Sequence, residues 1–270
     1  MLEPGLQRAL TDLAATPRLL VTSDFDGTMA PIVNNPADAR PLPEAAAALE
    51  TLASLPETTA ALISGRALAV LRELSGASAA VQAVGSHGAE FDTGGLGAPP
   101  ACRGERSDSG NVPGFAHEID TALLQTITDT LREIAADRPG VTVETKPASV
   151  ALHVRNASEA DGAEALELAR AAAQSWDAHI TAGKAVLEFA VIVTDKGEAV
   201  DILRDRCAAT AVLFLGDDVT DEKAFARLHA GDVGVKVGPG ETLAGYRVDE
   251  PADVAEALRL VADTRARRKR

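Results

Sequence analysis

Residues 18–28 of the chain read RLLVTSDFDGT, an apolar run that ends in two carboxylates and a glycine. The run from Arg18 to Asp24 predicts a short buried strand, because continuous apolar residues are typical of strands covered on both faces. Asp24 and Asp26 stand two residues apart, so both can face the same space where the strand ends. Gly27 permits a tight turn there. The stretch therefore predicts a ligand site at the carboxyl edge of a parallel sheet.

Apolar strands and amphipathic helices alternate before and after this stretch. Helical spacing of apolar residues, or a short apolar run bounded by turn residues, marks each element. The expected helices cover 5–15, 44–55, 66–74, 196–206, 220–228 and 252–262, and the further strands cover 59–63, 80–84, 211–215 and 233–237. This order predicts an α/β fold with a doubly wound, Rossmann-like parallel sheet.

A segment of another kind interrupts the alternation. Residues 92–114 are rich in Gly, Pro and Ser and predict an exposed connection. The elements expected after it are helices over 116–136 and 159–175 and strands over 141–146, 149–155, 178–181 and 185–191. Strand pairs that follow helices are typical of an α+β layer with an antiparallel sheet. We therefore expect a core made of 1–112 and 192–270, with an α+β domain, 113–191, inserted into it.

The composition restricts the class of protein and its partners. Of 270 residues, 46% are hydrophobic and 3% aromatic, which favours a folded chain whose core consists of Ala, Val, Leu and Ile. The net charge of -14 predicts a small-molecule partner, no nucleic acid and no membrane; we expect a monomer. Two cysteines without CxxC spacing, and no basic and apolar leader, predict a cytoplasmic protein. The basic run 265–270 predicts a frayed, solvated terminus.

A second acidic cluster, GDDVTDE at 216–222, follows the apolar run AVLFL. Asp217 and Asp218 would lie at a strand end, where carboxylate oxygens suit a hard cation such as Mg2+. Asp221 has an alternative role in the acidic first turn of the helix that follows. Two acidic clusters that each close an apolar strand are harder to explain by capping, so together they predict a cation site.

Two further segments predict an anion site. Ser64, Gly65 and Arg66 follow the strand TTAALI, and Lys196 begins a helix. Hydroxyls, cations and helix N-termini bind phosphate oxygens, and Thr28 offers another hydroxyl. One carboxylate of the first cluster can attack phosphorus while the other, protonated, gives a proton to the leaving oxygen. The pattern therefore predicts phosphoryl-group chemistry.

These motifs, in this order and with an insertion, resemble the haloacid-dehalogenase-like phosphatase superfamily. The segments that resemble more closely the trehalose-6-phosphate phosphatases are DFDGT, ISGR, GSHGAE, VETKPASVALHVRNA, GKAVLE, KG and GDDVTDE. The resemblance implies a haloacid-dehalogenase-like core, an inserted cap domain and Mg2+-dependent hydrolysis of trehalose-6-phosphate through an aspartyl-phosphate. Ala190 and Val191 depart from it, because the family often has an Arg-Pro pair there.

The resemblance also implies roles for particular residues. Asp24 would be the nucleophile and Asp26 the acid and base. Mg2+ would be held by Asp24, Asp217 and the backbone carbonyl of Asp26, with Asp218 close by. The phosphate would be bound by Ser64 and Lys196.

The inserted domain is expected to have one polar sheet face. In SVALHVRN and GKAVLEF apolar and polar residues alternate, so each strand has an apolar side and a polar side. The predicted polar face carries Lys146, His153, Arg155, Lys184 and Glu188. Mixed donors and an acceptor suit sugar hydroxyls, although each residue alone is compatible with a solvated face. The resemblance places four of them in that role, His153, Arg155, Lys184 and Glu188, and leaves Lys146 open. His87 and Glu90 are candidate sugar contacts from the core, with a structural role for His87 as the alternative.

Three other functions share parts of this pattern. A phosphatase for another sugar phosphate, such as sucrose-6-phosphate or a mannosyl-phosphoglycerate, would have the same catalytic motifs. A phosphoacceptor signalling domain also combines an aspartate, Mg2+ and a lysine, but Asp26 as an acid and the inserted domain argue against it. A non-catalytic sugar-phosphate sensor is the third, and none of the motifs is degraded as that would require.

Overall fold

The computed structural model describes residues 2–92, 120–192 and 194–268. The chain forms two compact units, Met1–Gly110 with Thr194–Arg270, and Asn111–Val193. The domain expected at 113–191 lies within the second unit. The exposed connection expected over 92–114 and the start of the helix expected at 116 lie, apart from residue 92, outside the described residues.

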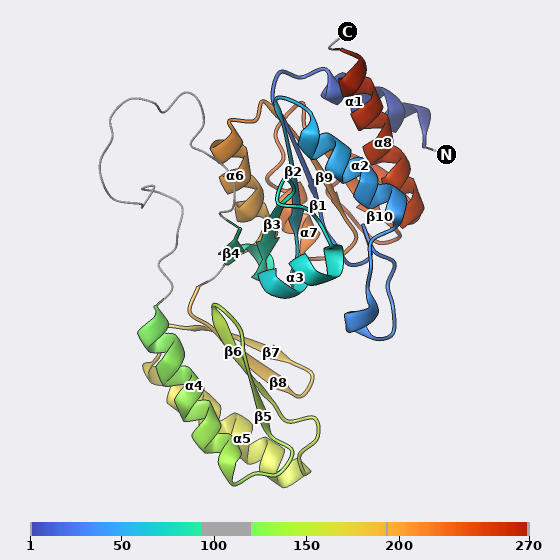
Figure 1. Cartoon of the computed structure of the whole chain (residues 1–270). Helices are drawn as coiled ribbons and strands as arrows, with labels where there is room; N and C mark the ends of the chain where they lie inside the picture. The colour runs from blue at the N-terminus through green and yellow to red at the C-terminus, as the bar shows by residue number, and fades with distance from the viewer. Residues whose placement is uncertain (1, 93–119, 193, 269–270) are drawn as a thin grey trace, which may run out of the picture. The chain divides into compact units, whose positions relative to one another are not determined.

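A seven-stranded sheet forms the centre of the first unit (Figure 1). Its strands are β1 (Leu19–Ser23), β2 (Thr58–Ile63), β3 (Gln82–Gly85), β4 (Glu90–Phe91), β9 (Ala211–Gly216), β10 (Val233–Val237) and β11 (Tyr246–Val248). Their order is β11-β10-β9-β1-β2-β3-β4, and only β4 is antiparallel to its neighbour. All residues of β1, β9 and β10 are buried, as expected for parallel strands covered on both faces.

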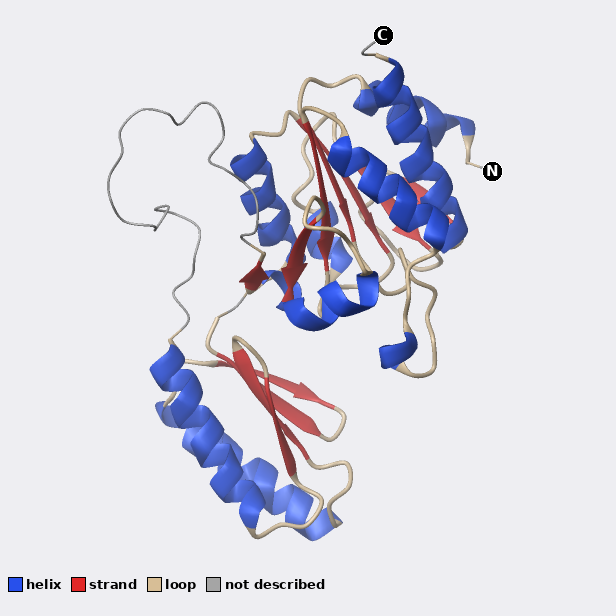
Figure 2. Ribbon diagram, viewed as in Figure 1, coloured by secondary structure: helices blue, strands red, loops and turns tan. Residues whose placement is uncertain are grey.

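Helices cover both faces of this sheet (Figure 2). One face packs against α1 (Pro4–Ala14), α2 (Pro43–Ser54), α3 (Leu68–Ser75) and α8 (Pro251–Arg267), and the other against α6 (Lys196–Cys207) and α7 (Asp221–Phe225). In α1 the buried residues Leu6, Leu10 and Leu13 recur at helical spacing, so one stripe of the helix faces the core. The doubly wound α/β prediction is confirmed.

The second unit is an α+β layer with an antiparallel sheet. Its strands are β5 (Thr142–Thr145), β6 (Ser149–His153), β7 (His179–Gly183) and β8 (Val186–Ala190), in the order β5-β6-β8-β7. Helices α4 (Thr121–Ala136) and α5 (Glu159–Ala172) pack on one face of the sheet, with Leu152, Leu187 and Phe189 in the core between them. Asp120 and Ser158 cap these helices, because their side chains accept the backbone N–H three residues on.

One expectation for the terminal residues is wrong. Helix α8 continues to Arg267, and Arg265 is only 7% exposed rather than solvated. Its guanidinium donates to Thr58 Oγ1 at 2.6 Å and to the carbonyl of Thr16 at 2.7 Å, so it ties α8 to the loop before β1 and to the start of β2. Strands β4 and β11 were not expected, because two or three residues give no clear alternation.

No helix within the described ranges combines the length and apolar character that a membrane span requires.

Candidate active site

Asp24 lies at the centre of the core sheet, directly after β1. Strand β1 pairs with β2 on one side and with β9 on the other, so chain segments from both halves of the sequence end beside it. The backbone N–H of Asp24 donates to the Leu215 carbonyl at 2.8 Å, and the residue is 4% exposed. This is the point where the strand order reverses, the place where doubly wound sheets bind ligands.

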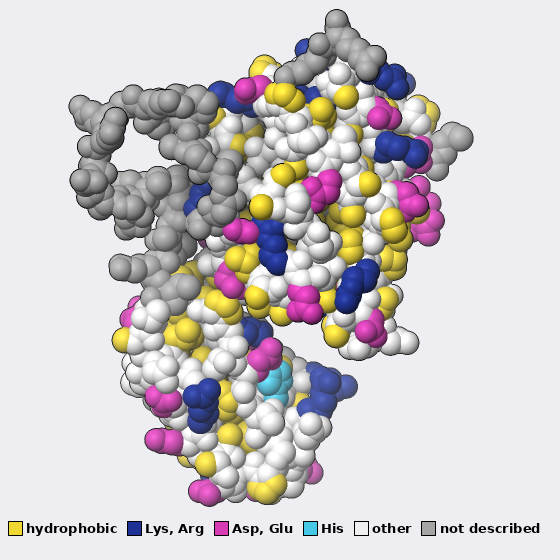
Figure 3. Space-filling view, in the orientation of Figure 1, with side chains coloured by type: hydrophobic (Ala, Val, Ile, Leu, Met, Phe, Trp, Pro, Cys, Tyr) yellow, Lys and Arg dark blue, Asp and Glu magenta, His cyan; other side chains and the backbone are white. Residues whose placement is uncertain are grey.

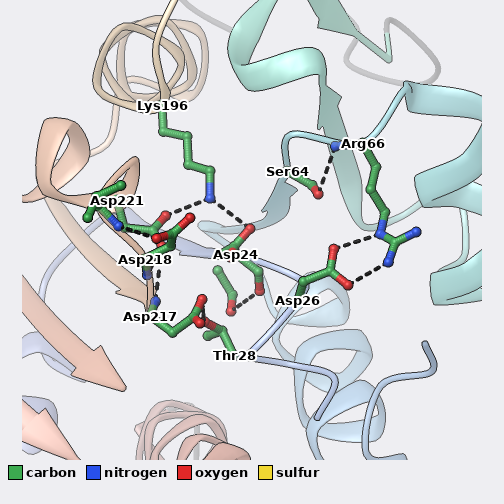
Figure 4. Close-up of polar contacts among 11 residues, drawn as sticks. Asp24, Asp26, Thr28, Ser64, Arg66, Lys196, Asp217, Asp218 and Asp221 are labelled. Carbon is green, nitrogen blue, oxygen red and sulfur yellow. Dashed lines mark hydrogen bonds and ion pairs between the residues drawn. The ribbon is translucent and has the colours of Figure 1, made fainter. Parts of the chain in front are cut away.

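Lys196 holds two buried carboxylates together (Figure 4). Its Nζ lies 2.8 Å from Asp24 Oδ1 and 2.7 Å from Asp221 Oδ1. The three side chains are between 0 and 6% exposed. Lys196 is the first residue of α6, whose N-terminus is capped by Asp195. A cation in this position can hold both Asp24 and a bound anion.

The charges of the cluster are unbalanced. Burial raises the pKa of Asp24 to about 8; Asp221 acts in the same direction, and Lys196 opposes both. Burial and Asp221 also raise the pKa of Asp217. Burial alone would lower the pKa of Lys196, but Asp24 and Asp221 outweigh it and raise that pKa. The carboxylates thus exceed what one lysine can neutralise, which favours an additional cation at this place.

The residues present fit a divalent cation. Carboxylate oxygens of Asp24, Asp217 and Asp221 all lie within 4.8 Å of one another. Asp221 Oδ2 also accepts the backbone N–H groups of Asp217, at 3.0 Å, and Asp218, at 2.9 Å. Asp221 therefore shapes the acidic loop as well as facing its neighbours. Three clustered carboxylate oxygens are the hard ligands that Mg2+ prefers.

The structure adds Asp221 to the neighbours of the expected metal ligands. Asp221, which the sequence also allowed as a helix-end residue, joins the cluster, and no side-chain cap is found at the start of α7. The side chain of Asp26, for which the backbone carbonyl was the expected ligand atom, and the carboxylate of Asp218 contact other donors. Asp26 is bound by Arg66, and Asp218 Oδ1 accepts the Val219 N–H at 2.6 Å. The sequence signal for Asp221 is its place in GDDVTDE. Spacing alone does not decide between a cation ligand and a residue of the first helical turn.

The loop after β2 carries the predicted anion-binding residues. Arg66 Nε and a terminal guanidinium nitrogen each donate to Asp26 at 2.6 Å, a bidentate pair visible in Figure 4. This contact raises the pKa of Arg66. Ser64 is 1% exposed, and its Oγ accepts the Arg66 N–H at 3.2 Å. Ser64 and Arg66 thus lie beside the two aspartates that follow β1.

The GSHGAE segment supports that loop from behind. Ser86 and His87 both have positive φ, 49° and 55°, and their N–H groups donate to the carbonyls of Arg66 and Ser64 at 2.7 and 2.9 Å. A Cβ on Gly65 would lie 2.5 Å from the His87 ring, so only glycine permits this packing. Glu90 does not face the ligand space. Its Oε2 accepts Ser86 Oγ–H at 2.7 Å and the Leu68 N–H, at the start of α3, at 3.0 Å.

These side chains surround a pocket of about 690 Å³. The described lining residues are Asp24, Asp26, Ile32, Val33, Pro36, Ser64, Gly65, Arg66, His87, Lys196, Asp217, Asp218 and Thr220. Of the predicted core residues, Thr28 and Glu90 are outside this lining. Thr28 is fully buried, and its hydroxyl donates to Asp217 Oδ1 at 3.4 Å. Thr28 and Glu90 therefore support the pocket rather than face it.

The predicted polar residues of the second unit fall into separate groups. Glu188 Oε1 accepts Lys146 Nζ at 2.9 Å and the Ser149 hydroxyl at 2.7 Å. His153 Nε2 lies 2.8 Å from Glu144 Oε2 on the same sheet face. Figure 3 shows basic, acidic and histidine side chains together on the visible surface of this unit.

Arg155 and Lys184 depart from the predicted strand pattern. Both are exposed and lie beyond the strand ends, Arg155 after β6 and Lys184 in the turn between β7 and β8. The next residue, Ala185, has φ of 62°, so alternation stops at the turn. The expected strands 149–155 and 185–191 were too long at these ends, and parity does not place either residue on the polar face.

A family model described as trehalose-phosphatase matches residues 22–252. The chain belongs to this family. It is 35% identical over 256 residues to a trehalose-phosphate phosphatase of Mycobacterium marinum, covering 91% of this chain and 62% of that protein. It is 31% identical over 271 residues to a probable trehalose-phosphate phosphatase 2 of Oryza sativa subsp. japonica, covering 94% and 70%. The chain thus spans about three fifths of the mycobacterial relative.

Solved structures show the same fold. A trehalose-6-phosphate phosphatase of Aspergillus fumigatus matches with a TM-score of 0.66 and 26% identity, covering 96% of this chain and 97% of that one. The C-terminal domain of the Candida albicans trehalose-6-phosphate phosphatase matches with a TM-score of 0.64, 26% identity and 96% coverage of both chains. The C-terminal domain of a Candida albicans trehalose synthase regulatory protein shares the fold at 13% identity and a TM-score of 0.60. The fold alone therefore does not fix the activity.

Proposed function

We propose that this protein is a phosphatase that hydrolyses trehalose-6-phosphate to trehalose and phosphate through an aspartyl-phosphate on Asp24. The observation that carries the proposal is the contact of Asp24 with Lys196 in a pocket that also contains Asp26, Ser64 and Arg66. A nucleophile, a second carboxylate two residues on and three phosphate-binding groups are what this chemistry requires.

In the first step an Asp24 carboxylate oxygen attacks phosphorus, and the bond from phosphorus to the sugar oxygen breaks. Asp26, in its protonated form, gives its proton to that leaving oxygen. Lys196 offsets the repulsion between Asp24 and the phosphate, and Ser64 donates to a phosphate oxygen. Arg66 binds Asp26 through two hydrogen bonds, and phosphate oxygens of the substrate would compete for the same guanidinium. Substrate binding would thus release Asp26 for proton transfer.

In the second step water attacks the phosphorus of the aspartyl-phosphate. Asp26, now ionised, takes a proton from that water, and the bond between phosphorus and Asp24 breaks. Inorganic phosphate leaves, the Asp24 carboxylate is restored, and Asp26 has regained the proton that it lost in the first step. The cycle therefore returns both aspartates to their starting states.

We propose Mg2+ as the cofactor. Asp24 and Asp217 would hold it, with the Asp26 backbone carbonyl as a further oxygen ligand; Asp221 and Asp218 lie beside them. When bound, it would neutralise the carboxylates and polarise the phosphate oxygens. The raised pKa values of Asp24 and Asp217 support this, because burial, and to a smaller extent Asp221, disfavours their ionised forms, and a bound cation would offset that cost.

We propose that the second unit is a cap that selects the sugar. The carboxylate of Glu188, which Lys146 and Ser149 orient, would accept hydrogen bonds from sugar hydroxyls. The other proposed sugar contacts are His87, His153, Arg155 and Lys184. Lys184 and Arg155 are exposed on turns of the cap and suit a polar ligand. The family membership supports trehalose-6-phosphate over other sugar phosphates.

The decisive experiment measures phosphate release from a panel containing trehalose-6-phosphate, sucrose-6-phosphate, a mannosyl-phosphoglycerate and a small aryl phosphate. We expect trehalose-6-phosphate to be preferred, chelation to abolish turnover and Mg2+ to restore it. Asp24→Asn should reduce turnover by at least about a thousandfold while circular dichroism stays unchanged. Preference for another sugar phosphate would refute the substrate alone. Near-normal turnover by Asp24→Asn would refute the mechanism, and binding of substrate without turnover would indicate a sensor.

A further inference from the structure

A second buried lysine lies behind the acidic loop. Lys236, on β10, is 4% exposed, and its ammonium group donates to the backbone carbonyl of Asp217. The acceptor is a neutral carbonyl oxygen rather than a carboxylate. An ammonium group is costly to bury, so packing alone does not account for a lysine at this position. The contact with Asp217 connects it to the candidate cation site.

The strand register brings Lys236 to this place. Val233, Val235 and Val237 alternate into the core on one side of β10, so Lys236 points to the opposite side. Its register partner on β9 is Gly216, the residue immediately before Asp217. The side chain therefore runs along the end of β9 and reaches the first peptide group of the acidic loop.

Asp217 is held from both sides of its Cα atom. Its N–H donates to Asp221 Oδ2 at 3.0 Å, and its carbonyl accepts from Lys236. Its side chain accepts the Thr28 hydroxyl at 3.4 Å and lies so close to Gly27 that a Cβ there would be 2.0 Å from Asp217 Oδ2. The carboxylate direction thus depends on two backbone contacts, one of which Lys236 supplies.

We propose that Lys236 is a positioning residue that holds Asp217 in the orientation needed to bind the divalent cation. The inference rests on the proposed function in so far as the cation is Mg2+. Groups that orient a metal ligand without touching the metal typically contribute about 10–100-fold to metal affinity. Lys236 supplies such a contact through the main-chain carbonyl of Asp217.

The test compares Lys236→Met with Val235→Ala in the full chain. Methionine keeps the length and bulk of the side chain and removes the ammonium group, whose partner is a neutral carbonyl rather than a buried carboxylate. Val235→Ala removes packing from the same strand on the opposite face. Metal-free proteins without substrate are titrated with Mg2+ by calorimetry, and the Mg2+-induced increase in Tm is measured in parallel.

We expect Lys236→Met to weaken Mg2+ binding by roughly tenfold or more, and Val235→Ala to lower Tm without changing the affinity. The Mg2+ concentration that half-activates hydrolysis should rise by a similar factor, while kcat at saturating Mg2+ stays within about twofold of wild type. If Lys236→Met binds Mg2+ with wild-type affinity, or if Val235→Ala loses as much affinity, the inference about Lys236 is wrong and the proposed cofactor is unaffected. A wild-type protein that binds no Mg2+ overturns the proposed cofactor together with it. Should Lys236→Met not fold, Lys236→Gln, whose shorter amide keeps the polarity, undergoes the same titration with the same outcomes.

Discussion

Replacing Lys196 by methionine tests how much this lysine contributes to the free energy of unfolding by neutralising the buried carboxylates. The ammonium lies 2.8 Å from Asp24 and 2.7 Å from Asp221, and all three side chains are almost fully buried. Removing one member of a buried ion pair typically costs about 3–5 kcal/mol, because the remaining charges lose their partner. Asp24 and Asp221 both lose their ion-pair partner here, so we expect Lys196→Met to lower the free energy of unfolding by an amount in the upper part of that range when no metal is bound.

The loss should depend on pH. Burial raises the pKa of Asp24 to about 8 with Lys196 present, and removing Lys196 would raise it further. A carboxyl whose pKa is higher in the folded than in the unfolded state stabilises the fold while protonated and loses that contribution as pH rises through the folded pKa. At low pH Asp24 is protonated in both proteins and the missing lysine matters less. The difference in unfolding free energy should therefore be larger at about pH 9 than at about pH 6.

Urea unfolding followed by circular dichroism measures this difference, with chelator present and then with Mg2+ added. Lys223→Met is the matched control, because Lys223 is exposed on α7 near the same site and its replacement should change stability by less than about 0.5 kcal/mol. Mg2+ should recover part of the stability of Lys196→Met by neutralising the same carboxylates, whereas turnover should stay severely reduced. A loss below about 1 kcal/mol at high pH, or a loss that does not change with pH, would refute the charge-balance argument.

Two further predictions concern the ligand. Arg66→Lys keeps the charge but cannot form the bidentate contact, so competitive inhibition by inorganic phosphate should weaken by roughly tenfold. Arg72→Lys, which alters the neighbouring Arg72–Asp92 pair, is the control and should leave the inhibition unchanged. Equal inhibition constants in both variants would contradict the role of Arg66. Glu188→Ala should lower kcat/KM for trehalose-6-phosphate by roughly tenfold to a few hundredfold but hardly change kcat/KM for an aryl phosphate. Glu167→Ala, at an exposed position, is the control. A parallel loss on both substrates would point to misfolding rather than sugar recognition.

The sequence predicts the core well where strands are long and apolar. The motifs DFDGT, ISGR and GDDVTDE stand at the carboxyl ends of the apolar segments that form β1, β2 and β9. Parallel pairing of these strands brings their carboxyl ends to one edge of the sheet. The sequence alone therefore predicts that Asp24, Ser64 and Asp217 are neighbours. Lys196 followed from its place at the start of a helix, since helix N-termini also meet at that edge.

The residues that sequence reasoning missed act through backbone contacts. Lys236 appears in VGVKV as one polar residue in an apolar strand, and nothing in that pattern reveals that it reaches the Asp217 carbonyl. Glu90 looked like a ligand group because GSHGAE resembles the family, yet its carboxylate is occupied by Ser86 and the start of α3. Such contacts depend on side-chain direction at element ends, which neither periodicity nor spacing determines.

The insertion interrupts the chain at a point that leaves the core sheet intact. It leaves the core after β4 and returns just before α6, so the pairing of β1 with β9, Leu19 opposite Ala211, closes the core sheet independently of the inserted residues. That pairing brings Asp217 beside Asp24, and α6 brings Lys196. Under the proposed function, changes in the second unit would alter sugar recognition without disturbing the carboxylates.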